Sequence, residues 1–324
     1  MGLEVDMYTR ILLPLDGSPP SEHAAGVGLA LAARLKAEVV LLQVLEPHRF
    51  QELRDHTEAL AQARTVGQAL LEHWHKEARR RHIPTVQRLE EQRDIAQAIL
   101  QTALEQRCDL VILGTHGRTG LPRVLLGSVA ERVARLSPLP VLLVRGEGPE
   151  KAPEFKRILV ALDGSEFSQE ALRHADALAG KIGARLSLVH VVPDITQMLA
   201  GSGRAWMYAN RGALQAQLEA EQKRLREQGQ FILKEAQQQC THCDKLHPIL
   251  QEAHRYHISE RICRVAEAER ADLIVLGTHG LSGWRQFFLG SVANEVAHRA
   301  KQPVLLVRKP QNEPDEAHLP APGK

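Results

Sequence analysis

The chain has 324 residues, of which 44% are hydrophobic and 25% are charged, and its formal net charge is +2. This is the composition of an ordinary globular protein, and the length predicts two domains of usual size. The small net charge gives no reason to expect binding to nucleic acid or to an anionic membrane. No stretch of eighteen or more apolar residues occurs, so we expect no membrane span.

Cysteine content and the first residues of the chain both favour a cytoplasmic protein. The four cysteines are Cys108, Cys240, Cys243 and Cys263. So few cysteines in two domains are typical of a reduced protein and not of a disulfide scaffold. Residues 1–10 include acidic side chains and no long apolar stretch, so we expect no signal peptide.

A stretch rich in glycine occurs twice in the chain. In the first copy, Gly114-Thr-His-Gly117 is followed by nine residues and then by Gly127-Ser128. The second copy begins at Gly277, 163 residues later, and has the same spacing. Each copy follows a short aliphatic run and precedes a segment with a helical pattern. The stretch is neither a Walker loop nor the Gly-x-Gly-x-x-Gly pattern of dinucleotide-binding proteins.

The repetition extends well beyond this loop. Residues 109–145 and 272–308 align without a gap and are identical at 21 of 37 positions. An earlier block, residues 10–18, recurs as residues 157–165 at an offset of 147. The second half therefore has 16 additional residues, which we assign to the stretch from Pro193 to about Gly229. Periods of this length indicate a duplicated domain and not a solenoid. We predict one domain at 1–150, a second domain at 151–309 and a disordered tail at 310–324.

Strand and helix patterns alternate within each half. In the first half, apolar runs predict strands at 10–15, 38–45, 84–89, 110–113 and 140–144. Helices are predicted from Ser18, an N-cap followed by proline, to about Leu35, and at 57–81, 94–106 and 127–136. The second half repeats this order. Alternation of this kind predicts two tandem doubly wound α/β domains, each with helices on both faces of a parallel sheet.

Two loops in each half follow the carboxyl ends of strands, where doubly wound sheets bind ligands. One loop begins with Asp16-Gly-Ser or Asp163-Gly-Ser, and its carboxylate can accept hydrogen bonds from a base or a ribose. The other is the glycine loop, which lets the backbone approach a ligand and opens a helix whose N–H groups favour phosphate. The hydroxyl of Ser128 can reach a phosphate or its Mg²⁺. Alternatively, Asp16 is a helix N-terminal cap residue beside Ser18. The occurrence of this aspartate together with the glycine loop, in both halves, favours the ligand role.

Together, the glycine loop, the strand-end Asp-Gly-Ser and the closing Pro-Val-Leu-Leu-Val strand resemble the universal stress protein family over nearly all of both halves. The resemblance implies a five-stranded parallel sheet in each domain. It also implies ATP binding, because family members with this loop bind ATP. The implied site residues are Pro14, Leu15, Asp16, Val44, Gly114, His116, Gly117, Gly127, Ser128 and Val129 in the first half, and Leu162, Asp163, Val191, Gly277, His279, Gly280, Gly290, Ser291 and Val292 in the second. Ala161 replaces Pro14 in the second half.

The loop histidines and one arginine refine this hypothesis. His116 and His279 have no partner base or nucleophile within the motif, so we interpret them as donors to ribose or phosphate and not as catalysts. Arg118 directly follows the first loop's second glycine, where a guanidinium can reach the phosphates, whereas Leu281 occupies this position in the second half. We therefore expect the N-terminal site to bind ATP more tightly.

Three functions remain to be compared. The first is a cytoplasmic ATP-binding protein that acts as a sensor or regulator in a stress response. The second is a slow ATPase or another nucleotide-dependent enzyme, which the lack of a catalytic residue pattern disfavours. The third is a nucleotide-free interaction module, which the intact glycine loops disfavour.

The two final strands and one cysteine pair suggest further contacts. Strands 140–144 and 303–307 would be exposed sheet edges, and family members commonly dimerise through this strand, so we expect the two copies to pair within the chain. A homodimer of the whole chain is left open. Cys240-Thr-His-Cys243 has the spacing of metal ligands, but a second Cys-x-x-Cys is missing, so two reduced thiols at a helix end are the favoured interpretation.

Overall fold

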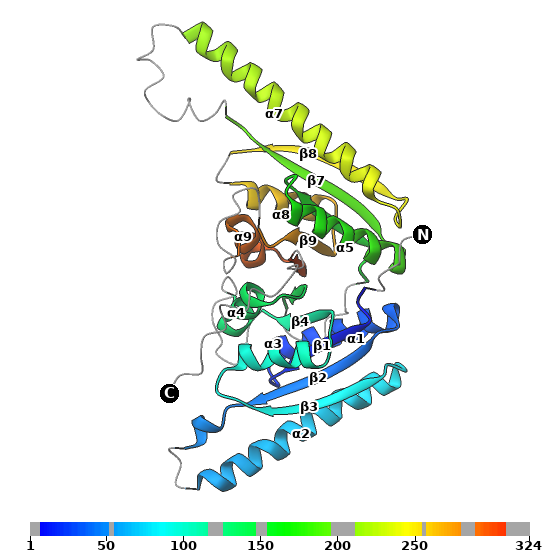
Figure 1. Cartoon of the computed structure of the whole chain (residues 1–324), viewed down its shortest axis with the longest axis vertical. Coiled ribbons are helices and arrows are strands. Elements are labelled where there is room, and N and C mark those ends of the chain that lie inside the picture. The colour runs from blue at the N-terminus through cyan, green and yellow to red at the C-terminus, as the bar shows by residue number, and fades with distance from the viewer. Residues whose placement is uncertain are drawn as a thin grey trace.

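The computed structural model of the chain describes residues 7–51, 55–115, 126–146, 154–195, 211–254, 257–279 and 289–308 (Figure 1). The elements of the first half are β1 (Arg10–Leu15), α1 (Pro19–Leu35), β2 (Glu38–Leu45), a 3-10 helix (Pro47–Phe50), α2 (His56–Arg80), β3 (Thr85–Glu91), α3 (Ile95–Glu105), β4 (Leu110–Gly114), α4 (Ser128–Leu136) and β5 (Val141–Val144). Those of the second half are β6 (Arg157–Leu162), α5 (Glu166–Ile182), β7 (Arg185–Pro193), α7 (Arg211–Gln239), β8 (Leu246–Ala253), α8 (Ile258–Ala268), β9 (Leu273–Gly277), α9 (Ser291–Arg299) and β10 (Val304–Val307).

The described strands form a single sheet in the order β3-β2-β1-β4-β5-β10-β9-β6-β7-β8. Neighbours within each half are parallel, and the sequence order reverses beside β1 and β6, as a doubly wound sheet requires. At the centre β5 and β10 run antiparallel, with Leu142 opposite Leu305. The predicted fold class, two tandem doubly wound domains with five-stranded parallel sheets, is therefore confirmed.

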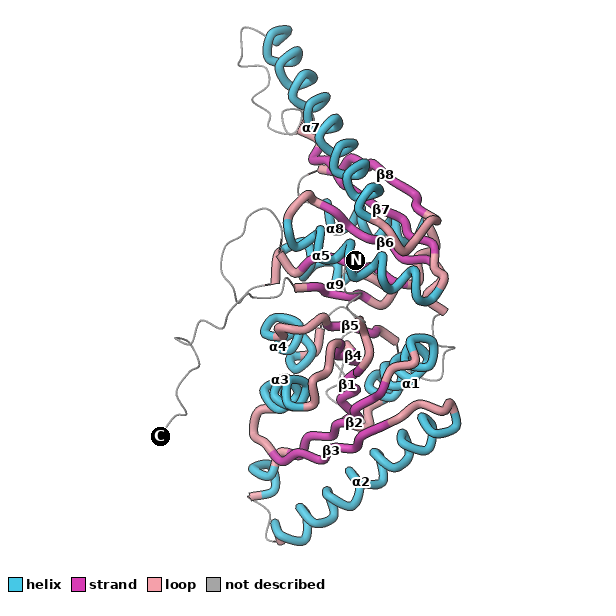
Figure 2. Tube along the Cα trace, turned by 45° about the vertical axis from the view of Figure 1, so that its right-hand side comes forward, coloured by secondary structure: helices cyan, strands magenta, loops and turns pink. Residues whose placement is uncertain are grey.

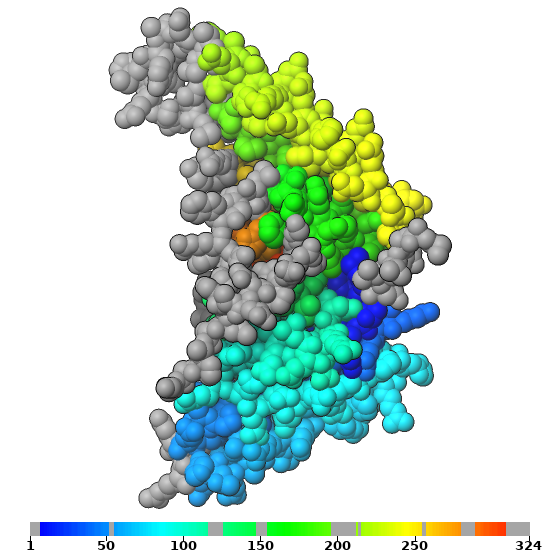
Figure 3. Space-filling model, viewed as in Figure 1, coloured from blue at the N-terminus to red at the C-terminus, as the bar shows by residue number. Residues whose placement is uncertain are grey.

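Helices cover both faces of this sheet (Figure 2). One face is packed against α1, α2, α5 and α7, and the other against α3, α4, α8 and α9. Successive strand side chains alternate between the two hydrophobic clusters, as in β4, where Ile112 belongs to the first and Val111 to the second. Both clusters run through both halves. Figure 3 shows the resulting elongated body, with α7 and β8 at one end and α2 and β3 at the other.

Most element boundaries agree with the sequence to within a residue or two. The third strand extends to Glu91 because it pairs with β2 as far as Leu45. The 3-10 helix at Pro47–Phe50 was not expected, since its four residues have no periodic pattern. The additional residues of the second half are divided between the connection from β7 to α7 and the elements that follow it, since α7 has 29 residues where α2 has 25. Residues 196–210 of that connection lie outside the described residues.

The two halves hold each other at one face through a reciprocal contact of two arginines. Arg145, just after β5, donates from Nη2 to the carbonyls of Ala297 (3.1 Å) and His298 (2.7 Å) at the end of α9. Its counterpart Arg308, just after β10, donates to the carbonyl of Arg135 (2.6 Å) near the end of α4. Each guanidinium thus meets the negative end of the other half's helix, which is a stabilising arrangement.

On the opposite face, α1 and α5 meet across the same boundary. Lys181 donates to the carbonyl of Met7 (3.1 Å), and its counterpart Arg34 donates to the carbonyl of Glu154. The residues beside these carbonyls, Tyr8 and Phe155, are also counterparts, and each is at most 2% exposed. The contact is therefore approximately symmetric.

The symmetry is broken by three hydrogen-bonded side chains, Tyr8, His174 and Glu170. The Tyr8 hydroxyl lies 2.6 Å from Nδ1 of His174, and Nε2 of His174 lies 3.2 Å from Glu170. The counterparts of His174 and Glu170 are Val27 and His23. Burial, reinforced by the adjacent Arg173 guanidinium and opposed by Asp109, lowers the pKa of His174 from 6.5 to about 4. A neutral imidazole with Nε2 protonated satisfies both neighbours, accepting from Tyr8 and donating to Glu170.

The lowered pKa of His174 predicts that the stability of the protein depends on pH. Because the pKa of His174 is lower in the folded than in the unfolded chain, its contribution is complete above about pH 6.5 and is lost as the pH falls towards 4. The change amounts to at most about 3 kcal/mol. We expect the His174→Gln variant, which can hydrogen-bond without titrating, to lose less stability than the wild type between pH 7 and pH 4.5 in urea unfolding. If the free energy of unfolding fell equally with pH in the two proteins, His174 would not be the group responsible.

Candidate functional site

The loop after β1 is a tight turn built around Asp16. Its Oδ1 accepts from the N–H (2.9 Å) and the hydroxyl (2.6 Å) of Ser18, and Gly17 has φ of 74°, a conformation that favours glycine. The hydroxyl oxygen of Ser18 in turn caps α1 by accepting from the N–H of Ser21 (3.4 Å). Asp16 thus has a structural role here, but Ser18 and not Asp16 is the residue that caps the helix.

The second half repeats this turn. Oδ1 of Asp163 accepts from the N–H (3.0 Å) and the hydroxyl (2.6 Å) of Ser165, and Gly164 has φ of 81°. Ser165 caps α5 through the N–H of Ser168 (3.2 Å). In both halves, then, the carboxylate at the end of the strand fixes the start of the next helix.

The first glycine of each repeated loop has a packing role that the sequence did not reveal. A Cβ at Gly114 would lie 2.6 Å from the carbonyl oxygen of Pro20, in the first turn of α1. A Cβ at Gly277 would lie 2.7 Å from the backbone of Phe167, in the first turn of α5. These glycines therefore let the capped helix approach the end of the neighbouring strand, which brings the two loops together.

A backbone hydrogen bond joins the described ends of each glycine loop. The N–H of Gly127 donates to the carbonyl of Thr115 (2.6 Å), and the N–H of Gly290 donates to the carbonyl of Thr278 (2.7 Å). Both glycine N–H groups are therefore occupied, and donors to a ligand begin one residue later than the sequence suggested. The predicted site residues His116, Gly117, Arg118 and Gly280 lie outside the described residues.

The helices that follow these loops start without a side-chain cap. Among the described residues, no side chain caps α4 at Gly127 or α9 at Gly290. The helices α2 and α8 also lack a side-chain cap, whereas α1, α3 and α5 each have one. The N–H groups of Ser128, Val129 and Ala130 have no acceptor within the first turn of their helix. They point along the helix axis at its positive end, which is an arrangement suited to an anion.

Partly exposed apolar side chains lie on the face of the sheet that α3 and α4 cover, and one of them, Val129, is in the first turn of α4. Pro14, Val44 and Val129, all predicted from the sequence, are partly buried, and so is Ile95, which sequence reasoning missed. The side chain of Leu15 instead belongs to the cluster on the opposite face, so only its backbone can face this edge.

The second half has the corresponding set. Ala161, Val191, Ile258 and Val292 contact the same cluster as their counterparts, while Leu162 faces the opposite side. The predicted apolar side chains thus lie on one face of the sheet, except for the two strand-end leucines.

His279 has neighbours that the motif did not predict. Its Nδ1 lies 3.0 Å from the hydroxyl of Thr278, and its ring lies 5.0 Å from the ring of Phe167, tilted by 40°. Phe167 is replaced by Pro20 in the first half, so the two sites differ here.

Cys240 and Cys243 lie in a turn that is anchored by Asp176 of α5. The carboxylate of Asp176 accepts from the N–H of Thr241 (2.9 Å) and of Cys243 (2.9 Å), and from Nδ1 of His242 (2.9 Å). Both cysteines are free thiols, and burial raises the pKa of Cys240 to about 12, which disfavours the thiolate that a metal requires. Within the described part of the chain, no group of three or more His, Cys, Asp and Glu side chains could hold a metal ion.

The fold and the paired loops define a class of tandem α/β proteins with two equivalent candidate sites. The family model described as "Universal stress protein family" matches residues 7–145 and again residues 154–308. The chain belongs to the universal stress protein family. Within the described residues, no helix is both long and apolar enough to cross a membrane.

Relatives and solved structures agree with this assignment. A universal stress protein of Mycolicibacterium smegmatis is 30% identical over 231 residues, 70% of each chain. One from Methanocaldococcus jannaschii is 33% identical over 162 residues, 49% of this chain and 85% of its own. The crystal structure of a universal stress protein from Archaeoglobus fulgidus superposes with a TM-score of 0.65 at 20% identity, covering 93% of this chain and 98% of its own, which supports the fold.

The turn around Asp176 gives a test of the cysteine pair. Replacing Asp176 with Ala leaves three backbone N–H groups without their acceptor, so we expect a loss of about 3 kcal/mol in the free energy of unfolding. The Asp244→Ala variant, at an exposed position in the same turn, serves as the control and should be neutral. A stabilising effect of Zn²⁺ that disappears in Cys240→Ser would show instead that the turn is a metal site.

Proposed function

We propose that each half binds an adenine nucleotide, with its phosphates at the start of α4 or α9. One observation carries the proposal. Gly127 (φ −62°, ψ 146°) and Gly290 (φ −57°, ψ 149°) have backbone conformations open to any residue, yet both positions lack a side chain and a capping group. Room for an anion at the uncapped helix start accounts for both absences.

The nucleoside part of the ligand would occupy the apolar surface beside this helix start. Partly exposed Pro14, Val44, Ile95 and Val129 offer a face for a base, and the turn at Asp16 provides oxygen acceptors at the strand end. The hydroxyl of Ser128 is exposed on the first turn of α4 and suits a phosphate or its Mg²⁺.

The resulting protein would be an ATP-binding sensor or regulator in the cytoplasm, with a stress response as its context. Two nucleotide sites on one continuous sheet suit a protein that reports nucleotide levels. Slow hydrolysis of ATP is the alternative, and release of ADP by the purified protein over several hours distinguishes the two.

A double variant tests the phosphate position. Val at both Gly127 and Gly290 places branched side chains at the helix starts without disturbing φ, so we expect a folded protein that no longer binds ATP. Isothermal titration calorimetry measures the loss, and circular dichroism confirms the fold. Unchanged affinity in the folded double variant would contradict the site assignment.

The single variants report each site separately. With Gly290→Val the remaining site is the N-terminal one, which we expect to bind ATP about tenfold more tightly because of Arg118. The matched variant Gly127→Val leaves the C-terminal site. Equal dissociation constants, or a tighter C-terminal site, would show that Arg118 does not contribute.

We also propose that the β5–β10 pairing holds the two halves together in solution. The two domains of one chain would then be arranged like the two subunits of a dimer of single-domain proteins. The antiparallel ladder and the reciprocal contacts of Arg145 and Arg308 support this. A protease site inserted between residues 147 and 153 allows the halves to be cut apart. The cut protein should elute from a gel-filtration column as one body of about the original size, whereas separate half-sized species would refute the pairing. Light scattering on the uncut chain tests for a homodimer.

A further inference from the structure

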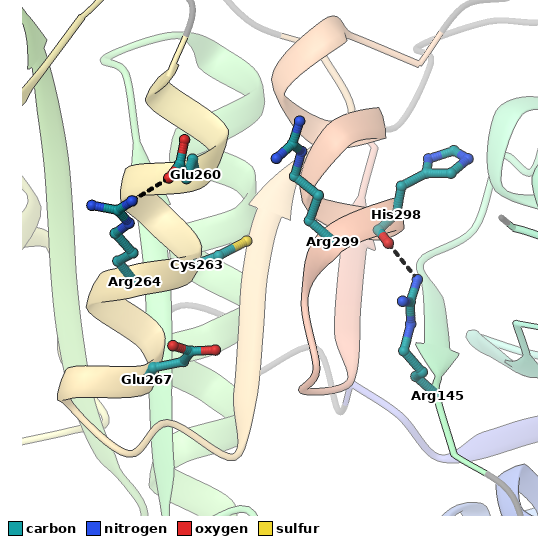
Figure 4. Close-up of a pocket in the computed structure, with 7 residues that line it drawn as sticks. All are labelled: Arg145, Glu260, Cys263, Arg264, Glu267, His298 and Arg299. Atoms are coloured by element: carbon teal, nitrogen blue, oxygen red, sulfur yellow. Dashed lines mark hydrogen bonds and ion pairs between the residues drawn. The ribbon is translucent and has the colours of Figure 1, made fainter. Parts of the chain in front are cut away.

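Many contacts of the two halves repeat each other, but the surroundings of the glycine loops do not. Arg145 reaches the end of α9 (Figure 4), as Arg308 reaches the end of α4. By contrast, the first turn of α5 has Phe167 at the position where α1 has Pro20. The second half therefore has an aromatic ring at a position where the first half has none.

The ring of Phe167 lies against the imidazole of His279, in the second glycine loop. The two ring centres are 5.0 Å apart and the ring planes are tilted by 40°, which is a usual geometry for packed aromatic rings. The side chain of His279 is only partly exposed, and the hydroxyl of Thr278 lies 3.0 Å from its Nδ1. Two neighbours of different chemistry therefore restrict how the imidazole can turn.

Both neighbours of the imidazole are themselves held in place. Thr278 is buried, its N–H donates to the carbonyl of Val307 (2.9 Å), and its carbonyl accepts from the N–H of Gly290 (2.7 Å). The backbone of Phe167 lies so close to Gly277 that a Cβ on this glycine would be 2.7 Å from it. The imidazole therefore lies between two residues whose backbones are fixed by the fold.

Phe167 also belongs to the other loop of the second site. Ser165 caps α5 and at the same time donates to Asp163 (2.6 Å), so the first turn of α5 is built on the aspartate turn at the strand end. The contact of Phe167 with His279 joins this turn to the glycine loop. It thus fixes the position of the imidazole relative to both loops of the site.

We infer that Phe167 is a positioning residue of the second nucleotide site. By packing against His279, it holds the imidazole in the orientation in which a ring nitrogen donates to the ribose or the phosphates of the nucleotide. A donor that is already oriented loses less conformational freedom when the ligand binds, so the affinity is higher. This inference rests on the proposed function, because it requires that the second site holds a nucleotide within reach of His279.

Titration of a single site with ATP tests this role. The full chain with Gly127→Val retains only the second site. In this background we expect Phe167→Leu, which keeps an apolar side chain but loses the ring, to weaken ATP binding by about threefold to tenfold. Phe167→Tyr keeps the ring and should retain most of the affinity. Equal affinities with phenylalanine and leucine at this position would overturn the inference.

The same substitution in the other background is the matched control. With Gly290→Val only the first site remains, and Phe167→Leu should then leave the dissociation constant for ATP unchanged. Equal losses in the two backgrounds would mean that the substitution disturbs the protein as a whole, and Phe167 would not be specific to the second site.

A double-mutant cycle shows whether Phe167 acts through His279. In the Gly127→Val background, His279→Ala should weaken ATP binding by about tenfold because a donor is lost. Adding Phe167→Leu should then cause no further loss, since no imidazole is left to position. Additive losses, or no effect of His279→Ala, would contradict the positioning role.

The outcomes also separate this inference from the proposed function. If the Gly127→Val protein bound no ATP at all, the proposed second site would itself be refuted. If it bound ATP with an affinity that did not depend on Phe167, only the positioning role would be refuted.

Discussion

The antiparallel pairing of β5 with β10 is the contact on which the arrangement of the whole molecule depends. Both strands have only four residues, VLLV in each case, and all eight side chains are buried. Alone, each would be a short apolar edge that invites association. When they pair, the two five-stranded sheets become one sheet, and both hydrophobic clusters continue across the boundary. The pairing also brings Arg145 and Arg308, which follow these strands, to the end of a helix in the other half.

Local patterns were sufficient to predict the strands and the α-helices and to propose a candidate site at the strand ends, but not the 3-10 helix at Pro47–Phe50. Apolar runs, the cap at Ser18 and the alternation of strands and helices depend on neighbouring residues, and the duplication allowed each interpretation to be checked twice. The strand-end turn at Asp16 and the helix start at Gly127 could be assigned for the same reason. The family resemblance added the nucleotide, which no local pattern specifies.

Contacts between distant residues could not be predicted in this way. Gly114 resembles a ligand-binding glycine in the sequence, but its missing side chain also makes room for the backbone of α1. The closure of the loop by the N–H of Gly127 and the anchoring of the Cys240 turn by Asp176 depend on where the chain returns in three dimensions. The spacing of Cys240 and Cys243 gives no sign that their turn contacts a carboxylate 64 residues before Cys240.

Fusion of the two halves has an evolutionary consequence at the contact of α1 with α5. In a dimer of identical subunits every substitution appears on both sides of the axis, so a new side chain must be tolerated twice. Here Tyr8 meets His174 on one side, while their counterparts Phe155 and Val27 are both apolar. A single gene encoding both copies allows each side to change alone. The molecule can therefore keep the architecture of a symmetric pair while its two halves acquire different chemistry.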